Sequence, residues 1–300
     1  MKFTARSIAA TSAVWALAAC SGGHIQPVTG LPAAESRNSS TALLYIAADS
    51  YVNVYNQAGK DQKPIDMLTG FGTVGGVHVA PNGDVSISDI NADTISFYHQ
   101  GQHTAFLQLT DAHNPGRIAV DSNGTVYVNN TVSNYVSVYA NGSTTPTAYL
   151  QDSFGCYSTS VATDASDDLF VSSGCGVIDE FLAGQATPTV LGNGFGYAED
   201  IAIDSNQNLV VDDQTANDHE IAIYAPPYAH RQKELNDGTD YINAIALGGG
   251  GTALWFTDMT KHYGSQRTYP GLKRSRDHTS TQGLGSSGLY GIAVYPPETN

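Results

Sequence analysis

Three tyrosines precede apolar segments of this chain at one fixed spacing. Tyr157, Tyr197 and Tyr241 each lie four residues before the first apolar residue of such a segment, and Phe195 lies six residues before it. Aromatic rings at a surface can stack on a sugar or grip a peptide. We therefore take these residues as ligand-binding candidates, with packing between neighbouring repeats as the alternative.

Charged and amide side chains stand next to the same segments. Glu199 and Asn243 lie two residues before the first apolar residue, and Asp200 and Arg117 lie one residue before it. Carboxylate and amide oxygens bind hard divalent cations such as Ca²⁺, and a guanidinium binds carboxylates or phosphates. These positions predict a polar site where the segments begin.

Two further registers hold side chains that could take part in binding. His78 stands where the other copies of the segment have alanine, so it lines a channel or is a satisfied core histidine. Polar residues end the strand that follows each segment: Asp89, Asn130, Asp213 and Asp258. They either form an acidic ring that holds a cation or brace the next turn through backbone N–H groups.

All these residues belong to a unit that recurs along the chain. Its copies begin at Val77, Ile118, Val161, Ile201, Ile245 and Ile292. Each copy has an apolar strand, a turn rich in Asp, Asn and Gly, and a second strand; Asn and Gly tolerate the positive φ of a tight turn. Third and fourth strands follow in most copies, and four strands in roughly 40 to 45 residues are typical of a propeller blade.

The two ends of the repeat array predict a closed ring. The last copy stops where its first turn should begin, and the first segment, 43–46, resembles a second strand without a first. Strand 291–295 would therefore complete the N-terminal blade and leave no open sheet edge. We predict an all-β, six-bladed β-propeller; a β-sandwich would not explain the even spacings.

The pattern resembles NHL-repeat propellers and, more loosely, the gluconolactonase-like six-bladed group. The segment "GRIAVDSNGTVYVNNTVSNYVSVY" (116–139) carries the likeness, which covers roughly residues 42–300. The gluconolactonase-like resemblance implies a divalent metal held by Glu, Asn and Asp at strand ends. Glu199, Asn243 and Asp258 are the nearest residues of those types in this chain.

Two cysteines flank the first hairpin of the fourth blade. If that hairpin turns at Ala165 and Ser166, paired residues have numbers that sum to about 331, as Cys156 and Cys175 do. They would then face each other within reach of a disulfide. Free thiols or a metal-binding pair are the alternatives.

The N-terminus indicates export and lipid attachment. Lys2 and Arg6 precede a short uncharged apolar run, which is typical of a signal peptide. The following Leu17-Ala18-Ala19-Cys20 resembles the lipobox of bacterial lipoproteins, which implies cleavage before Cys20 and lipid on that cysteine. We expect a signal at 1–19, a flexible tether at 20–41 and the propeller at 42–300. Ser21 favours the outer membrane if the cell is Gram-negative.

The net charge of the chain limits the kinds of partner that it can bind. Cleavage would leave 11 basic against 28 acidic residues, a formal charge of −17, which disfavours nucleic acid. Basic residues gather at 261–276, where they form either a positive patch or degraded strands of the last blade.

The sequence contains no G-x-S-x-G, H-E-x-x-H or P-loop motif. We therefore expect a monomeric, anchored module that binds a protein, peptide or carbohydrate without catalysis. A metal-dependent lactonase and a structural envelope protein are the alternatives.

Overall fold

The structure is a computed structural model, and it describes only part of the chain. The described residues are 42–57, 62–110, 113–153, 155–192, 195–214, 219–235, 241–248, 250–273, 281, 284 and 288–297. Cys20, the expected signal and the expected tether lie outside them. The predictions for residues 1–41 therefore stay predictions.

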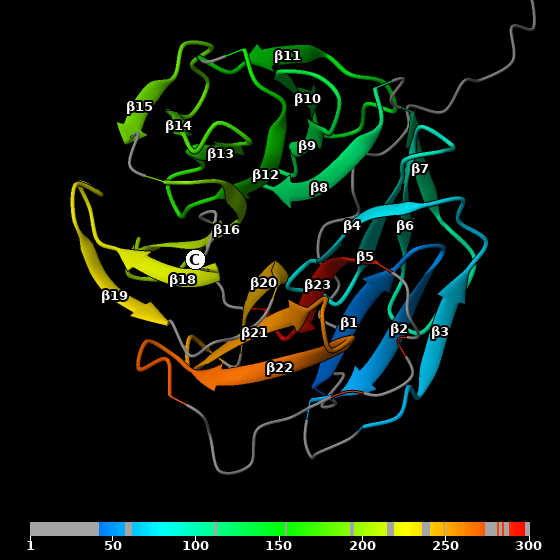
Figure 1. Ribbon diagram of the computed structural model, residues 1–300. Coiled ribbons are helices and arrows are strands. Elements are labelled where there is room, and N and C mark those ends of the chain that lie inside the picture. Colours follow the sequence, from blue (N-terminus) through cyan, green and yellow to red (C-terminus); the bar gives the residue numbers. More distant parts are fainter. Residues whose placement is uncertain are drawn as a thin grey trace, which may run out of the picture.

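The described residues form strands grouped into six antiparallel sheets, which stand around a ring (Figure 1). Blade 1 contains β23 (Leu289–Tyr295), β1 (Leu43–Ala48), β2 (Tyr51–Asn56) and β3 (Asp66–Thr69). Blade 2 contains β4 (Val74–Val79), β5 (Val85–Asp89), β6 (Thr94–Tyr98) and β7 (Leu107–Thr110). Blade 3 contains β8 (Pro115–Val120), β9 (Val126–Asn130), β10 (Tyr135–Tyr139) and β11 (Ala148–Gln151). The predicted six-bladed propeller is confirmed.

The second half of the ring continues the same order. Blade 4 contains β12 (Ser158–Thr163), β13 (Leu169–Ser173), β14 (Ile178–Phe181) and β15 (Thr189–Gly192). Blade 5 contains β16 (Ala198–Ile203), β17 (Leu209–Gln214), β18 (His219–Tyr224) and β19 (Arg231–Leu235). Blade 6 has three strands within the described residues: β20 (Ile242–Gly248), β21 (Ala253–Asp258) and β22 (Tyr263–Thr268).

Local turn chemistry explains why each inner hairpin forms. In blade 3, one carboxylate oxygen of Asp121 accepts hydrogen bonds from the backbone N–H groups of Asn123 and Thr125. Gly124 has φ 78°, which a residue without Cβ adopts at no steric cost. Asp164 and Asp204 brace the corresponding turns of blades 4 and 5. The Asp-rich turns of the repeat are thus built for this geometry.

The first and last strands close the ring. β23 pairs antiparallel with β1, from Leu43 opposite Tyr295 to Ala48 opposite Leu289, and the two strands lie side by side in Figure 1. Blade 1 is therefore made of both ends of the described chain, as the missing half-units predict. Among the described residues, no helix has the length and apolar character needed to cross a bilayer.

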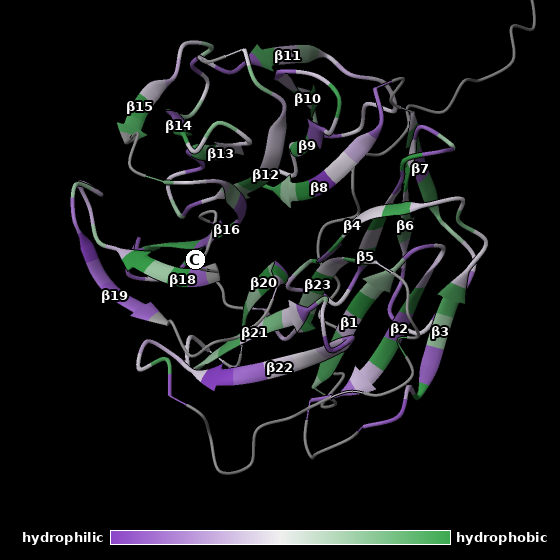
Figure 2. Ribbon diagram, in the orientation of Figure 1, coloured by the Kyte–Doolittle hydropathy of each residue, from purple (hydrophilic) through white to green (hydrophobic). Residues whose placement is uncertain are grey.

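The core lies between neighbouring blades. Figure 2 shows green, hydrophobic stretches on β1, β20 and β23 and a purple, hydrophilic outer strand β19. Apolar side chains from adjacent blades form shared clusters, such as Val77 and Ile87 with Tyr45 and Ala293. Burying each large side chain contributes roughly 1.5–3 kcal/mol. This packing fixes the relative positions of the loops at both ends of the ring.

The last blade favours the strand interpretation of the basic segment over the positive patch. Residues 263–268 form β22 within blade 6. Arg267 is only 2% exposed, with its guanidinium 4.9 Å from the centre of the Phe256 ring, so it does not belong to a surface patch. Lys261 lies 3.4 Å from Asp258, while Arg274 and Arg276 lie outside the described residues.

Candidate functional site

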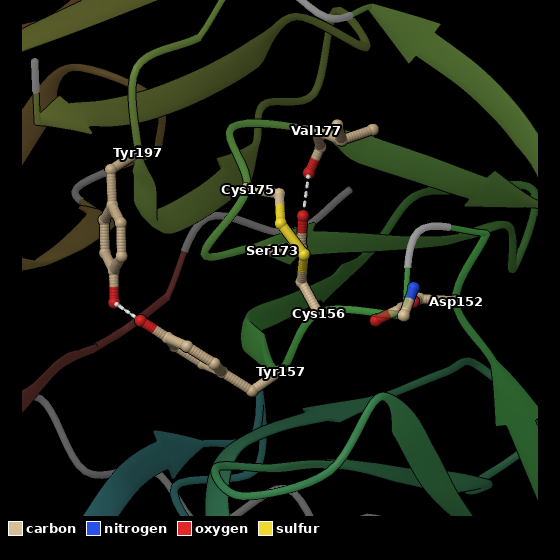
Figure 3. The surroundings of a disulfide bond; sticks show 8 residues. Asp152, Cys156, Tyr157, Ser173, Cys175, Val177 and Tyr197 are labelled. Carbon is tan, nitrogen blue, oxygen red and sulfur yellow. Dashed lines mark hydrogen bonds between the residues drawn. A yellow bond between two sulfur atoms is a disulfide. The ribbon is translucent and has the colours of Figure 1, made fainter.

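The three tyrosines lie at the strand-entrance end of blades 4, 5 and 6. Tyr157 is 45% exposed and Tyr241 is 40% exposed, so neither is packed away between blades. The hydroxyls of Tyr157 and Tyr197 are 3.1 Å apart and share a hydrogen bond, as Figure 3 shows. We call the surface formed by Tyr157, Tyr197, Tyr241, Glu199 and Asn243 the tyrosine mouth.

The phenylalanine candidate has a different role. Phe195 packs edge-on against Tyr224, with ring centroids 5.2 Å apart, and adjoins the apolar cluster of blades 4 and 5. Phe71, at the same spacing in blade 2, packs edge-on against Tyr98. Phe71 and Phe195, six residues before the first apolar residue of the repeat, therefore pack against the core, while Tyr157 and Tyr241, four residues before it, are exposed.

The carboxyl group of Glu199 lies beside Tyr197. Asn243 donates a hydrogen bond of 2.8 Å to Glu199 from the neighbouring blade, so the structure brings these two predicted residues together. Burial raises the pKa of Glu199, and the Arg117 charge opposes that rise. Burial, followed by the Tyr157 hydroxyl and the Glu199 charge, raises the pKa of Tyr197. The Tyr197 hydroxyl thus stays protonated and can donate a hydrogen bond.

Arg117 reaches across the ring from blade 3. Its guanidinium donates a 2.6 Å hydrogen bond to the backbone carbonyl of Asn243 in blade 6, and it lies 3.7 Å from Asp200 in blade 5. Asp200 also accepts hydrogen bonds from Ser160 and from the backbone N–H of Ile245. Arg117 therefore links opposite sides of the ring directly below the tyrosine mouth.

Asp258 does not adjoin Glu199 through any described contact. It accepts a 2.9 Å hydrogen bond from the backbone N–H of Lys261, so it braces the turn after β21. Asp89 braces the corresponding turn in blade 2 through Asn91 and Ala92, and it also binds the N–H groups of Gly72 and Thr73. This register has the bracing role that was one of the two sequence interpretations.

Asp212 is a site residue that the sequence comparison missed. It is 0% exposed, stands opposite Asp200 across β16 and β17, and neither of its carboxylate oxygens has a hydrogen-bond partner among the described residues. Burial and then the charges of Glu199 and Asp200 raise its pKa well above the ordinary value. The sequence did contain a signal for Asp212, because other blades have an uncharged residue at this register: Ser88, Asn129, Ser172 and Thr257.

The predicted disulfide is present beside the mouth. Cys156 and Cys175 are bonded, with Cα atoms 6.1 Å apart (Figure 3). Pairing runs from Ser158 opposite Ser173, and a bulge then shifts the register by one residue. A Cβ added to Gly174 would lie 2.6 Å from the Tyr157 ring. The hairpin closed by the disulfide therefore cradles Tyr157 against a residue that must be small.

His78 lies in the wall of a cavity along the ring axis and does not belong to the tyrosine mouth. It lines this cavity together with the alanines that share its register. Among the described residues, no group of three or more histidine, cysteine or carboxylate side chains is arranged to hold a metal ion.

Comparisons with known proteins support the fold alone. No family model and no curated protein sequence matches this chain. A chain of the "Nidogen/Laminin Complex" crystal structure matches with a TM-score of 0.72 and 16% identity, covering 86% of this chain and 100% of that one. The hydrazine synthase of Kuenenia stuttgartiensis matches with a TM-score of 0.55 and 14% identity, covering 71% of this chain and 62% of that one. At these identities the likeness concerns the fold alone.

Proposed function

We propose that this chain is an exported, lipid-anchored binding module, and that its tyrosine mouth takes a cationic group from a ligand or a protein partner without catalysis. Cys20 would carry the lipid, residues 21–41 would be the tether, and the NHL-type propeller would present the mouth. The fold is compatible with this role because a chain of similar fold comes from the nidogen/laminin complex.

One observation carries the proposal: exposed aromatic rings lie beside carboxyl groups that outnumber the nearby cation. Three carboxylates, those of Glu199, Asp200 and Asp212, lie near a single guanidinium, that of Arg117. The charges of Glu199 and Asp212 both contribute to raising the pKa of Tyr241, after burial, which places all three in one electrostatic neighbourhood. An ammonium or guanidinium over such rings gains roughly 0.5–2 kcal/mol from cation–π attraction.

The chemistry of the mouth selects against other ligands. An anion would meet the ionised carboxylate of Glu199, and like charges at close range cost several kcal/mol. A lysine or arginine side chain would instead place its charge beside Glu199 and its methylene groups against the tyrosine faces. The formal charge of −15 on the whole chain would add long-range attraction for a basic partner.

The test compares two peptides that differ in one charge. A short peptide with a central lysine and its norleucine counterpart are titrated into the full chain by calorimetry. The lysine peptide should bind at least tenfold more tightly, and Glu199→Gln and Tyr241→Ala should each remove most of that difference. Tyr149→Ala, at an exposed tyrosine of blade 3, is the matched control. Equal binding of the two peptides would reject the proposal.

A metal-dependent hydrolase of the gluconolactonase-like kind is the second candidate. Buried oxygens of Asp212 and Asn243 have no hydrogen-bond partners among the described residues, and a divalent cation would satisfy such oxygens. In this geometry Asp212, rather than Asp258, would join Glu199 and Asn243. The candidate predicts one tightly bound Ca²⁺ per chain and lactone hydrolysis that Asn243→Ala abolishes. Elemental analysis that finds no such metal would exclude it.

A further inference from the structure

The axis of the ring contains a cavity that is separate from the tyrosine mouth. It has a volume of about 400 Å³ and is lined by residues of all six inner strands. Small-molecule pockets in proteins typically span about 300–1,000 Å³. Its wall consists mainly of alanine and branched aliphatic residues, with Ala119, Ala162, Ala202, Ala246 and Ala293 at one level. The cavity is large enough for a small organic molecule.

One end of the cavity is closed by the Arg117–Asp200 pair. Arg117 lines the cavity, and its guanidinium reaches the carbonyl of Asn243 on the far side of the ring. A Cβ added to Gly291 in blade 1 would lie 3.2 Å from this guanidinium, so the guanidinium also packs against that inner strand. The Arg117–Asp200 pair thus contacts blades 1, 5 and 6 and separates the cavity from the tyrosine mouth.

The other end opens at the hairpin turns. Pro81, Ser122 and Ala165 line the cavity there and are exposed. Asp164 and Asp167 also line this opening. Arg117, at the closed end and already paired, is the one lysine or arginine among the residues that line the cavity. An anion entering from the turns would therefore meet carboxylates with no cation to compensate them.

His78 supplies a hydrogen-bonding group in the wall. It replaces the alanine of the other blades and is half-buried on the cavity surface. Among the described residues its imidazole has no hydrogen-bond partner, and its burial lowers its pKa to about 4. A neutral imidazole offers one N–H donor and one nitrogen acceptor. A hydroxyl group, itself both donor and acceptor, complements that pair.

From this geometry we infer that the axial cavity is a second binding site, which takes a small uncharged, largely apolar molecule bearing a hydroxyl group. The apolar body lies against the alanine ring, and the hydroxyl bonds to His78. The carboxylates at the opening disfavour anions. A cation would lose its hydration inside an aliphatic wall, where unpaired charge is costly. The site does not depend on the function proposed for the tyrosine mouth.

Three probes of equal chain length test this inference: 1-hexanol, hexanoate and hexylamine. Each is titrated into the full chain while binding is followed by calorimetry and by the His78 ring resonances in NMR spectra. We expect 1-hexanol to bind more tightly than the other two and to shift the His78 signals. His78→Ala should weaken its binding roughly two- to tenfold, the usual effect of losing one hydrogen bond. Equal affinity for the three probes, or no effect of His78→Ala, would overturn the inference.

Filling the cavity provides an independent check. Ala202→Leu and Ala246→Leu place bulk on the wall from different blades, and each should abolish 1-hexanol binding. Circular dichroism establishes which of the two variants keeps the β-structure, and Tyr149→Ala is the folded control. Undiminished 1-hexanol binding by a folded leucine variant would show that the molecule binds elsewhere.

Discussion

At the scale of single residues, the site depends on how each side chain satisfies its polar atoms. The amide group of Asn243 donates to Glu199, while its buried oxygen has no partner among the described residues, and Asp258 accepts from the N–H of Lys261. Sequence spacing predicted that Glu199 and Asn243 would meet because they share a register in adjacent blades. For Asp258 the sequence offered two roles, a cation-binding ring or a braced turn, and only the structure decides between them, because the choice depends on the local backbone direction after the strand.

Asp212 gives a prediction about pH and stability. Its folded-state pKa is raised, so the folded state favours protonated Asp212. This contribution to stability is complete below the unfolded pKa of about 3.9 and is lost as pH rises through the folded pKa. Asn cannot ionise, so the Asp212→Asn variant does not lose stability in this way. We expect the variant to gain roughly 1–3 kcal/mol of unfolding free energy at pH 7 and nothing near pH 3. Denaturant unfolding at both pH values measures the difference.

Asp213 provides the matched control on the same strand. Its carboxylate accepts hydrogen bonds from the backbone N–H groups of Gly196 and Tyr197, so Asp213→Asn should lower stability at pH 7. If Asp212→Asn also lowered stability at pH 7, the prediction for Asp212 would be wrong. That outcome would favour the metal-dependent alternative over the peptide-binding proposal.

At the scale of elements, the inner hairpin is the unit that positions the site. The repeat predicted these hairpins because apolar strands and Asp-Asn-Gly turns have a clear local signature. The cysteine sum of 331 also predicted the disulfide, since antiparallel partners have a constant sum. The bulge at the start of β12 changes that sum to 332 beyond Ser158, and such irregularities leave no plain mark in the sequence.

Gly174 tests whether the hairpin positions Tyr157. Gly174→Ala would push the Tyr157 ring away, because the added methyl carbon would lie 2.6 Å from it. We expect a several-fold weaker affinity for the lysine peptide, with a change of less than about 1 kcal/mol in unfolding free energy. Gly271→Ala in blade 6 adds a methyl 3.2 Å from Thr268 and should leave binding unchanged. Unchanged affinity in Gly174→Ala would mean that the hairpin does not position Tyr157 for binding.

At the scale of the whole molecule, the fold was more predictable than the site. Six evenly spaced copies and a half-unit at each end require a closed ring, and β23 pairs with β1 as expected. The mouth and the cavity depend instead on side chains that reach across the axis, as Arg117 does from blade 3 to blade 6. Contacts between residues 126 positions apart in the chain cannot be read from a local pattern.

The central claim is that a cationic group binds at the tyrosine mouth. A crystal structure of the full chain with the lysine peptide tests it most directly. Our account predicts the lysine ammonium within hydrogen-bond distance of Glu199, with its methylene groups against Tyr157 and Tyr241. An ammonium bound at the carboxylates of the hairpin turns, or a peptide on the outer strands with the mouth empty, would contradict it.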